Sequence, residues 1–244
     1  MTEADASTTE APPAEQQPCL DGHIACACGK VRLDIIQPKS STSIVAPAAA
    51  LCQCTDCRYF AQAVAKYRQE CHPSTSAEAA DVLLESNAVD LKQVYKSDVV
   101  HLTGEDHLHA VKLTEKSPAI RYYSTCCGTP IMMDYVVAPF FIVYQHLIHP
   151  NDKSPTPFQV VPPRLVLFHR SAPPNSPPTP EGVPVRETAS LGFISYAIAR
   201  IILGFVAGKK TSPITSTLAQ VPVRVGLESI GKPLTPNQEQ QETN

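Results

Sequence analysis

Cysteine spacing constrains the fold of this chain more than any other feature of its sequence. Seven of the nine cysteines fall into three tight clusters, which are Cys26 and Cys28, then Cys52, Cys54 and Cys57, and finally Cys126 and Cys127. Thiolates separated by one or two residues can surround a tetrahedral ion with little backbone strain, and zinc is the usual partner of such soft ligands. We therefore expect one or two zinc ions per chain.

Charge and cysteine usage narrow the class of protein. The net charge is −3 and no large basic block is present, so we expect no nucleic-acid partner. The first residues lack the basic start and apolar run of a secretory signal. Nine cysteines without such a signal favour reduced thiols and metal over disulfides, and hence a cytoplasmic protein. A disulfide-rich secreted module is the alternative, and the odd cysteine count argues against it.

The 24 prolines are unevenly distributed and suggest how the chain is divided. Residues 1–18 have no apolar periodicity and predict a disordered leader. We expect a folded domain over 19–170 and a proline-rich linker over 171–187. An amphipathic helix is expected over 188–210, followed by a largely disordered tail over 211–244.

Apolar periodicity predicts a mainly β domain with a few short helices. Alternating apolar residues predict a strand within 24–35 and a second strand over 45–51. Helix formers after Cys57 predict a short helix over 58–70. Four alternating segments within 91–127 are separated by brief polar turns, which predicts an antiparallel meander.

The stretch LGFISYAIARIILGFV, over 191–206, predicts a helix that ends near Gly208. A membrane span needs about 20 apolar residues, so a shorter run with a central arginine argues against membrane insertion. We expect instead a core-packing or interfacial helix, with Tyr196 and Arg200 opposite its apolar stripe. The expected apolar stripe consists of Leu191, Ile194, Ile198, Ile201 and Phe205.

The order of these motifs resembles a known superfamily. CxCG followed by a strand, CxCxxCR opening a helix, and a CG-T-P closing motif resemble the glutathione-dependent formaldehyde-activating enzymes and centromere protein V (GFA/CENP-V) over about 22–131. The stretch HAVKLTEKSPAIRYYSTCCGTPI further resembles an uncharacterised branch whose members carry a CC-x-TP motif. The resemblance implies a small zinc-bound, Mss4-like β-sheet domain, often with two zinc ions.

The resemblance also implies a structural zinc held by Cys26, Cys28 and Cys127. The family's usual fourth cysteine falls on Ser124, which is a poor zinc ligand. Cys126 is the obvious substitute. Neighbouring side chains point apart in a strand, so Cys126 and Cys127 can share an ion only if a turn separates them.

A second zinc is implied at Cys52, Cys54 and Cys57, which are our candidate catalytic residues. Three protein ligands leave a fourth position for water or a substrate thiolate. Arg58 could attract an anionic thiol or a carboxylate, or it could be a solvated arginine at the helix start. Asp56 could accept the free helix amides or carry a proton.

The resemblance thus implies a zinc-dependent carbon–sulfur lyase acting on a small thiol adduct, with glutathione a possible thiol. No GxSxG elbow, phosphate-binding glycine loop or HExxH motif competes with this interpretation. The alternative is a non-catalytic zinc-binding module that mediates protein–protein interaction. The oligomeric state is not specified by the sequence.

Overall fold

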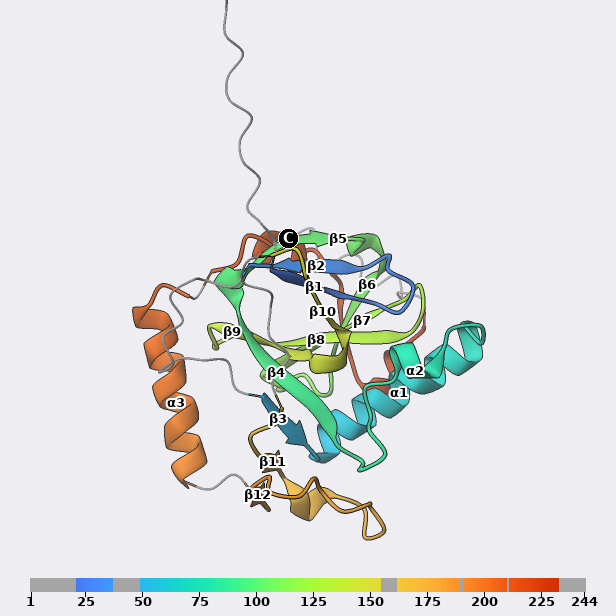
Figure 1. Ribbon diagram of the computed structural model, residues 1–244. Helices are drawn as coiled ribbons and strands as arrows, with labels where there is room; N and C mark the ends of the chain where they lie inside the picture. The colour runs from blue at the N-terminus through green and yellow to red at the C-terminus, as the bar shows by residue number, and fades with distance from the viewer. Residues whose placement is uncertain (1–20, 37–48, 155–161, 189–190, 210, 233–244) are drawn as a thin grey trace, which may run out of the picture.

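The computed structural model describes residues 21–36, 49–154, 162–188, 191–209 and 211–232 (Figure 1). Within these residues the chain is mainly β, as expected, with two sheets and four α-helices. The expected leader and the first part of the strand expected over 45–51 lie outside the described residues.

The larger sheet positions the second and third groups of cysteines, because Cys52 ends its strand β3 and Cys126 and Cys127 lie in the turn between its strands β7 and β8. Its nine strands follow the order β12-β11-β3-β4-β9-β8-β7-β6-β13, and most neighbours are antiparallel. The strands are β3 (Ala49–Cys52), β4 (Val89–Tyr95), β6 (Leu108–Lys112), β7 (Ala119–Ser124), β8 (Thr129–Tyr135), β9 (Phe140–Tyr144), β11 (Val166–Leu167), β12 (Val185–Arg186) and β13 (Val223–Val225).

The smaller sheet carries the first cysteine pair. Its four antiparallel strands follow the order β10-β1-β2-β5. The strands are β1 (Gly22–Ala25), β2 (Arg32–Ile35), β5 (Val99–Thr103) and β10 (Ile148–Pro150). The strand expected within 24–35 is therefore a hairpin of two short strands, with the first cysteine pair at its turn.

The expected four-strand meander is wrong in its middle. β4 and β6 belong to the larger sheet, but β5 leaves it and pairs with β2, with Leu102 opposite Leu33. Short 3-10 turns before and after β5 redirect the chain. Val99 and Leu102 are thereby buried in the core beside Leu33. Only the final hairpin, β6 with β7, pairs as the meander predicts.

One hydrophobic core joins the two sheets and the first helix. It includes Ile24 and Leu33 from the smaller sheet, Met132 from the larger one, and Phe60 and Val64 from α1. Burial of these apolar side chains is the main stabilising contribution to such a fold. The core therefore fixes the hairpin turn of β1 and β2 relative to the turn of β7 and β8.

The predicted helix after Cys57 is confirmed as α1 (Thr55–Cys71), and the single helical turn that follows is α2 (Ala77–Ala80). The N-cap of α1 is Cys54, whose sulfur accepts a hydrogen bond from the backbone N–H of Cys57 at 3.4 Å. Asp56 lies two positions after the N-cap, inside the first turn of the helix, so the expectation that it caps the helix is wrong.

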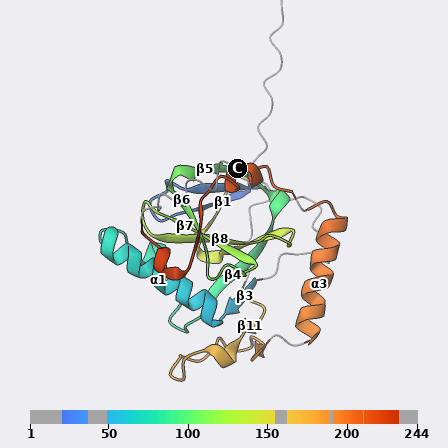
Figure 2. The ribbon, with the colours of Figure 1, turned by 180° about the vertical axis from the view of Figure 1, so that it is seen from behind.

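The C-terminal helix α3 (Leu191–Val206) lies on the opposite side of the molecule from α1 (Figure 2). Its orientation differs from the expected one, because Arg200 is buried whereas Ile198 and Phe205 are exposed. Gly204 packs against Pro139, which allows close approach of the helix on that side. No helix in the described parts of the chain has the length and apolarity that crossing a bilayer requires.

Residues expected to lie in a disordered tail instead pack on the larger sheet. The helix α4 (Thr215–Leu218) buries Leu218, and β13 pairs in parallel with β6. The expected linker over 171–187 likewise supplies β12, which pairs in parallel with β11. Residues 233–244 lie outside the described residues.

Candidate metal centres

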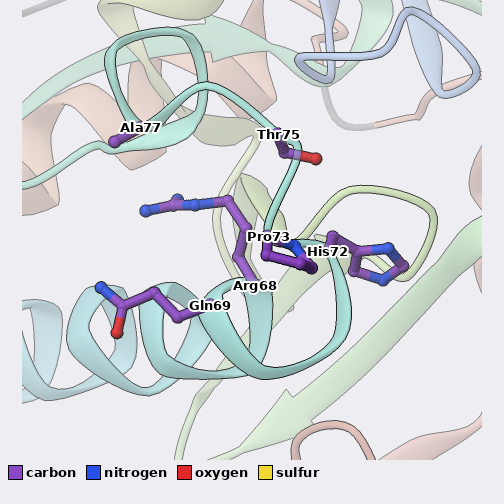
Figure 3. Close-up of a pocket in the computed structure, with 6 residues that line it drawn as sticks. All are labelled: Arg68, Gln69, His72, Pro73, Thr75 and Ala77. Carbon is purple, nitrogen blue, oxygen red and sulfur yellow. The ribbon is translucent and has the colours of Figure 1, made fainter.

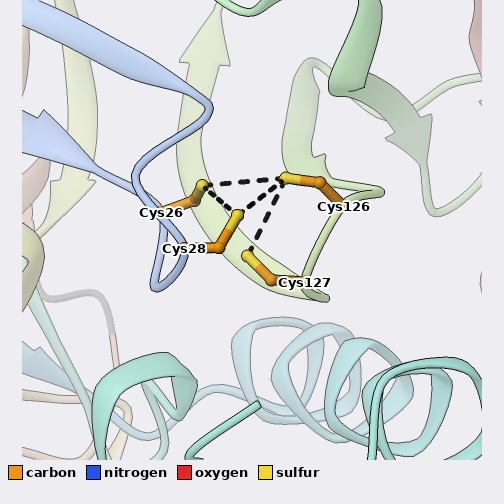
Figure 4. A group of neighbouring side chains, drawn as sticks. All are labelled: Cys26, Cys28, Cys126 and Cys127. Atoms are coloured by element: carbon orange, nitrogen blue, oxygen red, sulfur yellow. Dashed lines mark hydrogen bonds between the residues drawn. The ribbon is translucent and has the colours of Figure 1, made fainter. Parts of the chain in front are cut away.

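Two turns that are far apart in the sequence bring four cysteines together (Figure 4). Cys26 and Cys28 lie at the turn from β1 to β2, and Cys126 and Cys127 lie at the turn from β7 to β8. All four sulfur atoms lie within 4.8 Å of one another. Cys26 and Cys127 are buried, Cys28 is exposed and Cys126 is half-buried. We call these four residues the four-cysteine cluster.

The sulfur spacing of the four-cysteine cluster is compatible with tetrahedral coordination of a metal ion such as zinc. The Sγ–Sγ distances are 3.6 Å for Cys26–Cys28, 3.8 Å for Cys26–Cys126, 3.3 Å for Cys28–Cys126 and 4.0 Å for Cys126–Cys127. Four ligands at about 2.3 Å from zinc place neighbouring sulfurs about 3.8 Å apart. A disulfide needs about 2.0 Å, and these cysteines are free thiols. The four sulfurs could therefore hold one metal ion.

A turn allows the adjacent Cys126 and Cys127 to contribute to the same cluster. The chain turns over 125–128, where Gly128 has a φ of +61°. A Cβ at Gly128 would lie 2.9 Å from Cα of Arg68 on α1, so glycine is required both for its backbone conformation and for space. Cys126 and Cys127 thus lie in a turn and not in a strand, which is what the sequence analysis required for both to bind the same ion.

Ser124 supports this turn and stands beside the cluster. Its hydroxyl lies 3.2 Å from the sulfur of Cys127 and accepts a hydrogen bond from the backbone N–H of Thr129 at 3.1 Å. The hydroxyl of Thr129 also lies 3.2 Å from the Cys127 sulfur. On the other turn, the backbone N–H of Val31 donates to the sulfur of Cys26 at 3.3 Å. Donors around sulfur orient the ligands and stabilise thiolate charge.

These contacts shift the thiol pKa values within the four-cysteine cluster. The pKa of Cys127 is lowered to about 4, first by the hydrogen bond from the Cys26 thiol and further by Ser124 and Thr129. Burial raises the pKa of Cys126 to about 12. The hydrogen bond to Cys127 raises the pKa of Cys26 as well. One thiolate is thus favoured without metal, and a cation is needed to hold several of these sulfurs deprotonated.

The second candidate site consists of Cys52, Cys54 and Cys57, which we call the three-cysteine cluster. Cys52 ends β3, Cys54 caps α1 and Cys57 lies in the first turn of that helix. Their sulfurs also lie within 4.8 Å of one another, with 3.4 Å between Cys52 and Cys54. Cys52 and Cys57 are buried and Cys54 is half-buried. Three sulfurs could hold an ion and leave one tetrahedral position for another ligand.

The start of α1 favours negative charge on this cluster. The pKa of Cys54 is lowered to about 3, first by the hydrogen bond from Cys52, then by Cys57 and by the positive charge of Arg121. The pKa of Cys52 is raised to about 12, mainly by its hydrogen bond to Cys54. The thiolate at Cys54 sits where free helix amides and the helix dipole stabilise an anion.

Arg121 is the functional candidate that the sequence did not reveal. It lies on β7, its side chain is only 3% exposed, and its Nη2 lies 3.7 Å from the carboxylate of Asp56. Burial, and after it the charge of Cys57, raises the pKa of Tyr135 on β8 to about 12, and the positive charge of Arg121 opposes this rise. The only sequence feature that could have pointed to Arg121 is that it is a charged residue within a strand of mostly apolar and aromatic side chains, AIRYYS.

Arg58 is buried, so its interpretation as a solvated arginine at the helix start is wrong. Its Nε is buried without a hydrogen-bond partner. Asp56 is exposed and paired with Arg121, which leaves its suggested role as proton carrier a prediction.

A pocket of about 330 Å³ opens at the far end of α1, away from the three-cysteine cluster (Figure 3). Arg68 forms part of its wall and is paired with Asp81 at 2.7 Å. The lining residues are Arg68, Gln69, His72, Pro73, Thr75 and Ala77. This pocket therefore does not supply the substrate space that a lyase would need beside Cys57.

Comparison of the sequence with protein-family models and with curated proteins finds no match.

Proposed function

We propose that this protein binds two zinc ions, one in each cysteine cluster. The four-cysteine cluster provides a complete set of ligands, which is typical of a structural site. The three-cysteine cluster provides an incomplete set, which is typical of a site that accepts an outside ligand. The observation that carries the proposal is the meeting of two cysteine-bearing turns with sulfur spacings of 3.3 to 4.0 Å.

The three-cysteine cluster is the proposed site of carbon–sulfur lyase chemistry on a small thiol adduct. Zinc there supplies a Lewis acid that stabilises a thiolate. Cys52, Cys54 and Cys57 bind the ion, and α1 places its N-terminal amides beside Cys54. The motif resemblance to the GFA/CENP-V superfamily supports this specific chemistry and a Mss4-like domain. Glutathione is the thiol that the resemblance suggests.

A non-catalytic zinc module is the competing function, because both cysteine clusters could hold ions that serve only as scaffold sites. In that case both ions only stabilise the fold and the protein acts by binding a partner protein. The two functions differ in whether small thiols reach the second metal ion.

Metal content and thiol response test the proposal together. Zinc per chain is measured on the full-length protein, and cobalt-substituted protein is then titrated with glutathione while its visible absorption is followed. Two ions and a glutathione-dependent spectrum support the open site and justify a lyase assay. Two ions with an unchanged spectrum support the structural module. Absence of bound metal contradicts the proposal altogether.

A further inference from the structure

The outer face of the smaller sheet carries four ionisable side chains in one row. His149 on β10 lies directly opposite His23 on β1. His23 in turn lies opposite Asp34 on β2, and Asp34 lies opposite His101 on β5. Directly paired residues of antiparallel strands project to the same face of the sheet. Three histidines and one carboxylate are thereby brought together from four strands.

The neighbouring row of residues shows that this face points away from the core. That row is buried, and it consists of Ile148, Ile24, Leu33 and Leu102. Successive side chains of a strand alternate between the two faces, so the histidines lie on the opposite face. His149 and His101 are exposed and His23 is half-buried. The row is therefore accessible to ions in solution.

The spacing of His23 and His149 is compatible with two imidazole ligands on one metal ion. Their rings stack with centroids 5.0 Å apart and planes inclined by 24°. A zinc–nitrogen bond of about 2.1 Å places the centroid of a bound imidazole about 3.2 Å from the metal. At the tetrahedral angle, two such rings have centroids about 5 Å apart. Only side-chain rotation is then needed to direct one nitrogen of each ring at a shared ion.

Asp34 offsets the positive charge that lies closest to this pair. Arg32 stands two residues before Asp34 on the same face, where its charge alone would repel a cation. Its Nε donates to the Asp34 carboxylate at 2.7 Å, and the second carboxylate oxygen lies 3.6 Å from Nδ1 of His101. The carboxylate is therefore engaged by its own neighbours, and the two stacked imidazoles are the ligands that this face offers.

We propose that His23 and His149 bind a divalent transition-metal ion, such as zinc or nickel, on the outer face of the smaller sheet. Imidazole is a suitable ligand for both metals. Two protein nitrogens leave the remaining coordination positions to water, so this ion exchanges with the solution more readily than one held by three or four thiolates. The histidine site shares no residue with the cysteine clusters and does not rest on the proposed function.

Titration calorimetry on the full-length protein tests the inference. The protein is first loaded with zinc under reducing conditions and desalted, and its bound zinc is counted. Zinc chloride is then added, and we expect one further ion to bind per chain. His23→Asn and His149→Asn should each weaken this binding about tenfold or more, since loss of even a supporting residue at a metal site has an effect of that size.

His101→Asn is the matched control, because His101 lies on the same face, two strands away from His23, and its side chain is 62% exposed. This variant should bind the added zinc as the unaltered protein does. Thermal unfolding of each variant is measured before zinc is added, because His23 is half-buried. His149→Asn alters an exposed side chain and decides the test if His23→Asn fails to fold.

Loss of the further ion from the His23 and His149 variants, with the control unchanged, supports the inference. If no further ion binds, or if His149→Asn binds it as tightly as the unaltered protein, the inference is wrong. Equal weakening by His101→Asn would also overturn it, because the stacked pair would then not be the site. The zinc counted before the titration tests the cysteine clusters separately. Its absence would contradict the proposed function, while the titration would still decide whether the histidine pair binds metal.

Discussion

The sulfur of Cys28 lies 3.3 Å from the sulfur of Cys126, which stands 98 residues later in the chain. This contact joins the smaller sheet to the turn between β7 and β8. A metal ion at this point would cross-link two parts of the fold that are otherwise joined by core packing and by the hydrogen bond that the Ala27 N–H donates to the Thr129 hydroxyl at 3.2 Å. The free energy of unfolding should therefore depend on metal binding at the four-cysteine cluster.

Cys126→Ser should remove about one zinc ion per chain and lower the free energy of unfolding by more than about 3 kcal/mol, because structural zinc binding is coupled to folding. Zinc analysis and urea denaturation measure the two effects. Cys71→Ser is the matched control, since Cys71 is an exposed free thiol at the end of α1 and should change neither quantity. Equal effects of both variants would contradict the assignment.

The three-cysteine cluster should behave differently. Cys54→Ser should also remove about one zinc ion, but the serine hydroxyl can still cap α1. Cys54→Ala should lose the same ion, and its free energy of unfolding should be about 1 kcal/mol lower than that of Cys54→Ser, because the N-cap acceptor is gone. Zinc analysis and chemical denaturation in chelator separate the two contributions. If Cys54→Ser destabilises the protein as much as Cys126→Ser, the division into structural and open sites is wrong.

His109 should make stability depend on pH. Burial lowers its pKa to about 4 from an ordinary value of 6.5, and the charge of Arg224 adds to this shift. The unfolded chain therefore binds more protons than the folded one between about pH 6.5 and about pH 4, so stability should fall as the pH is lowered through that window. Urea midpoints at pH 7 and pH 5 measure the effect. His109→Gln should show a smaller difference between the two pH values, and an identical difference would contradict the prediction.

Local spacing predicted the cysteine clusters, a helix after Cys57 and the mainly β class, although the helix begins three residues earlier than predicted, at Thr55. The distant meeting of Cys28 with Cys126 depended on the motif resemblance, because sequence separation carries no direct information about contact. The partner of β5 could not be predicted for the same reason. Its alternating pattern specifies a strand but not its partner, and in the structure 3-10 turns on both sides of β5 accompany its pairing with β2.

The docking of α3 could not be read from its apolar stripe, because apolar residues occur around most of this helix. Ile201 packs near Tyr95 and Phe140, whereas Ile198 is 52% exposed. The decisive feature is steric. Gly204 has no side chain, and this allows the helix to approach the turn between β8 and β9 at Pro139. A single glycine within a helix is usually read only as a weak helix former.

Gly204→Ala should therefore destabilise the protein although alanine favours helices. The added Cβ would lie 2.5 Å from Cγ of Pro139, so the helix or the turn must move. We expect a loss of about 1–3 kcal/mol, as for other overpacked contacts. Ser195→Ala is the control on the same helix, because Ser195 is exposed and its replacement adds no atoms. Thermal unfolding of both variants checks the result. A Gly204→Ala protein as stable as Ser195→Ala would show that α3 does not depend on this contact for its position.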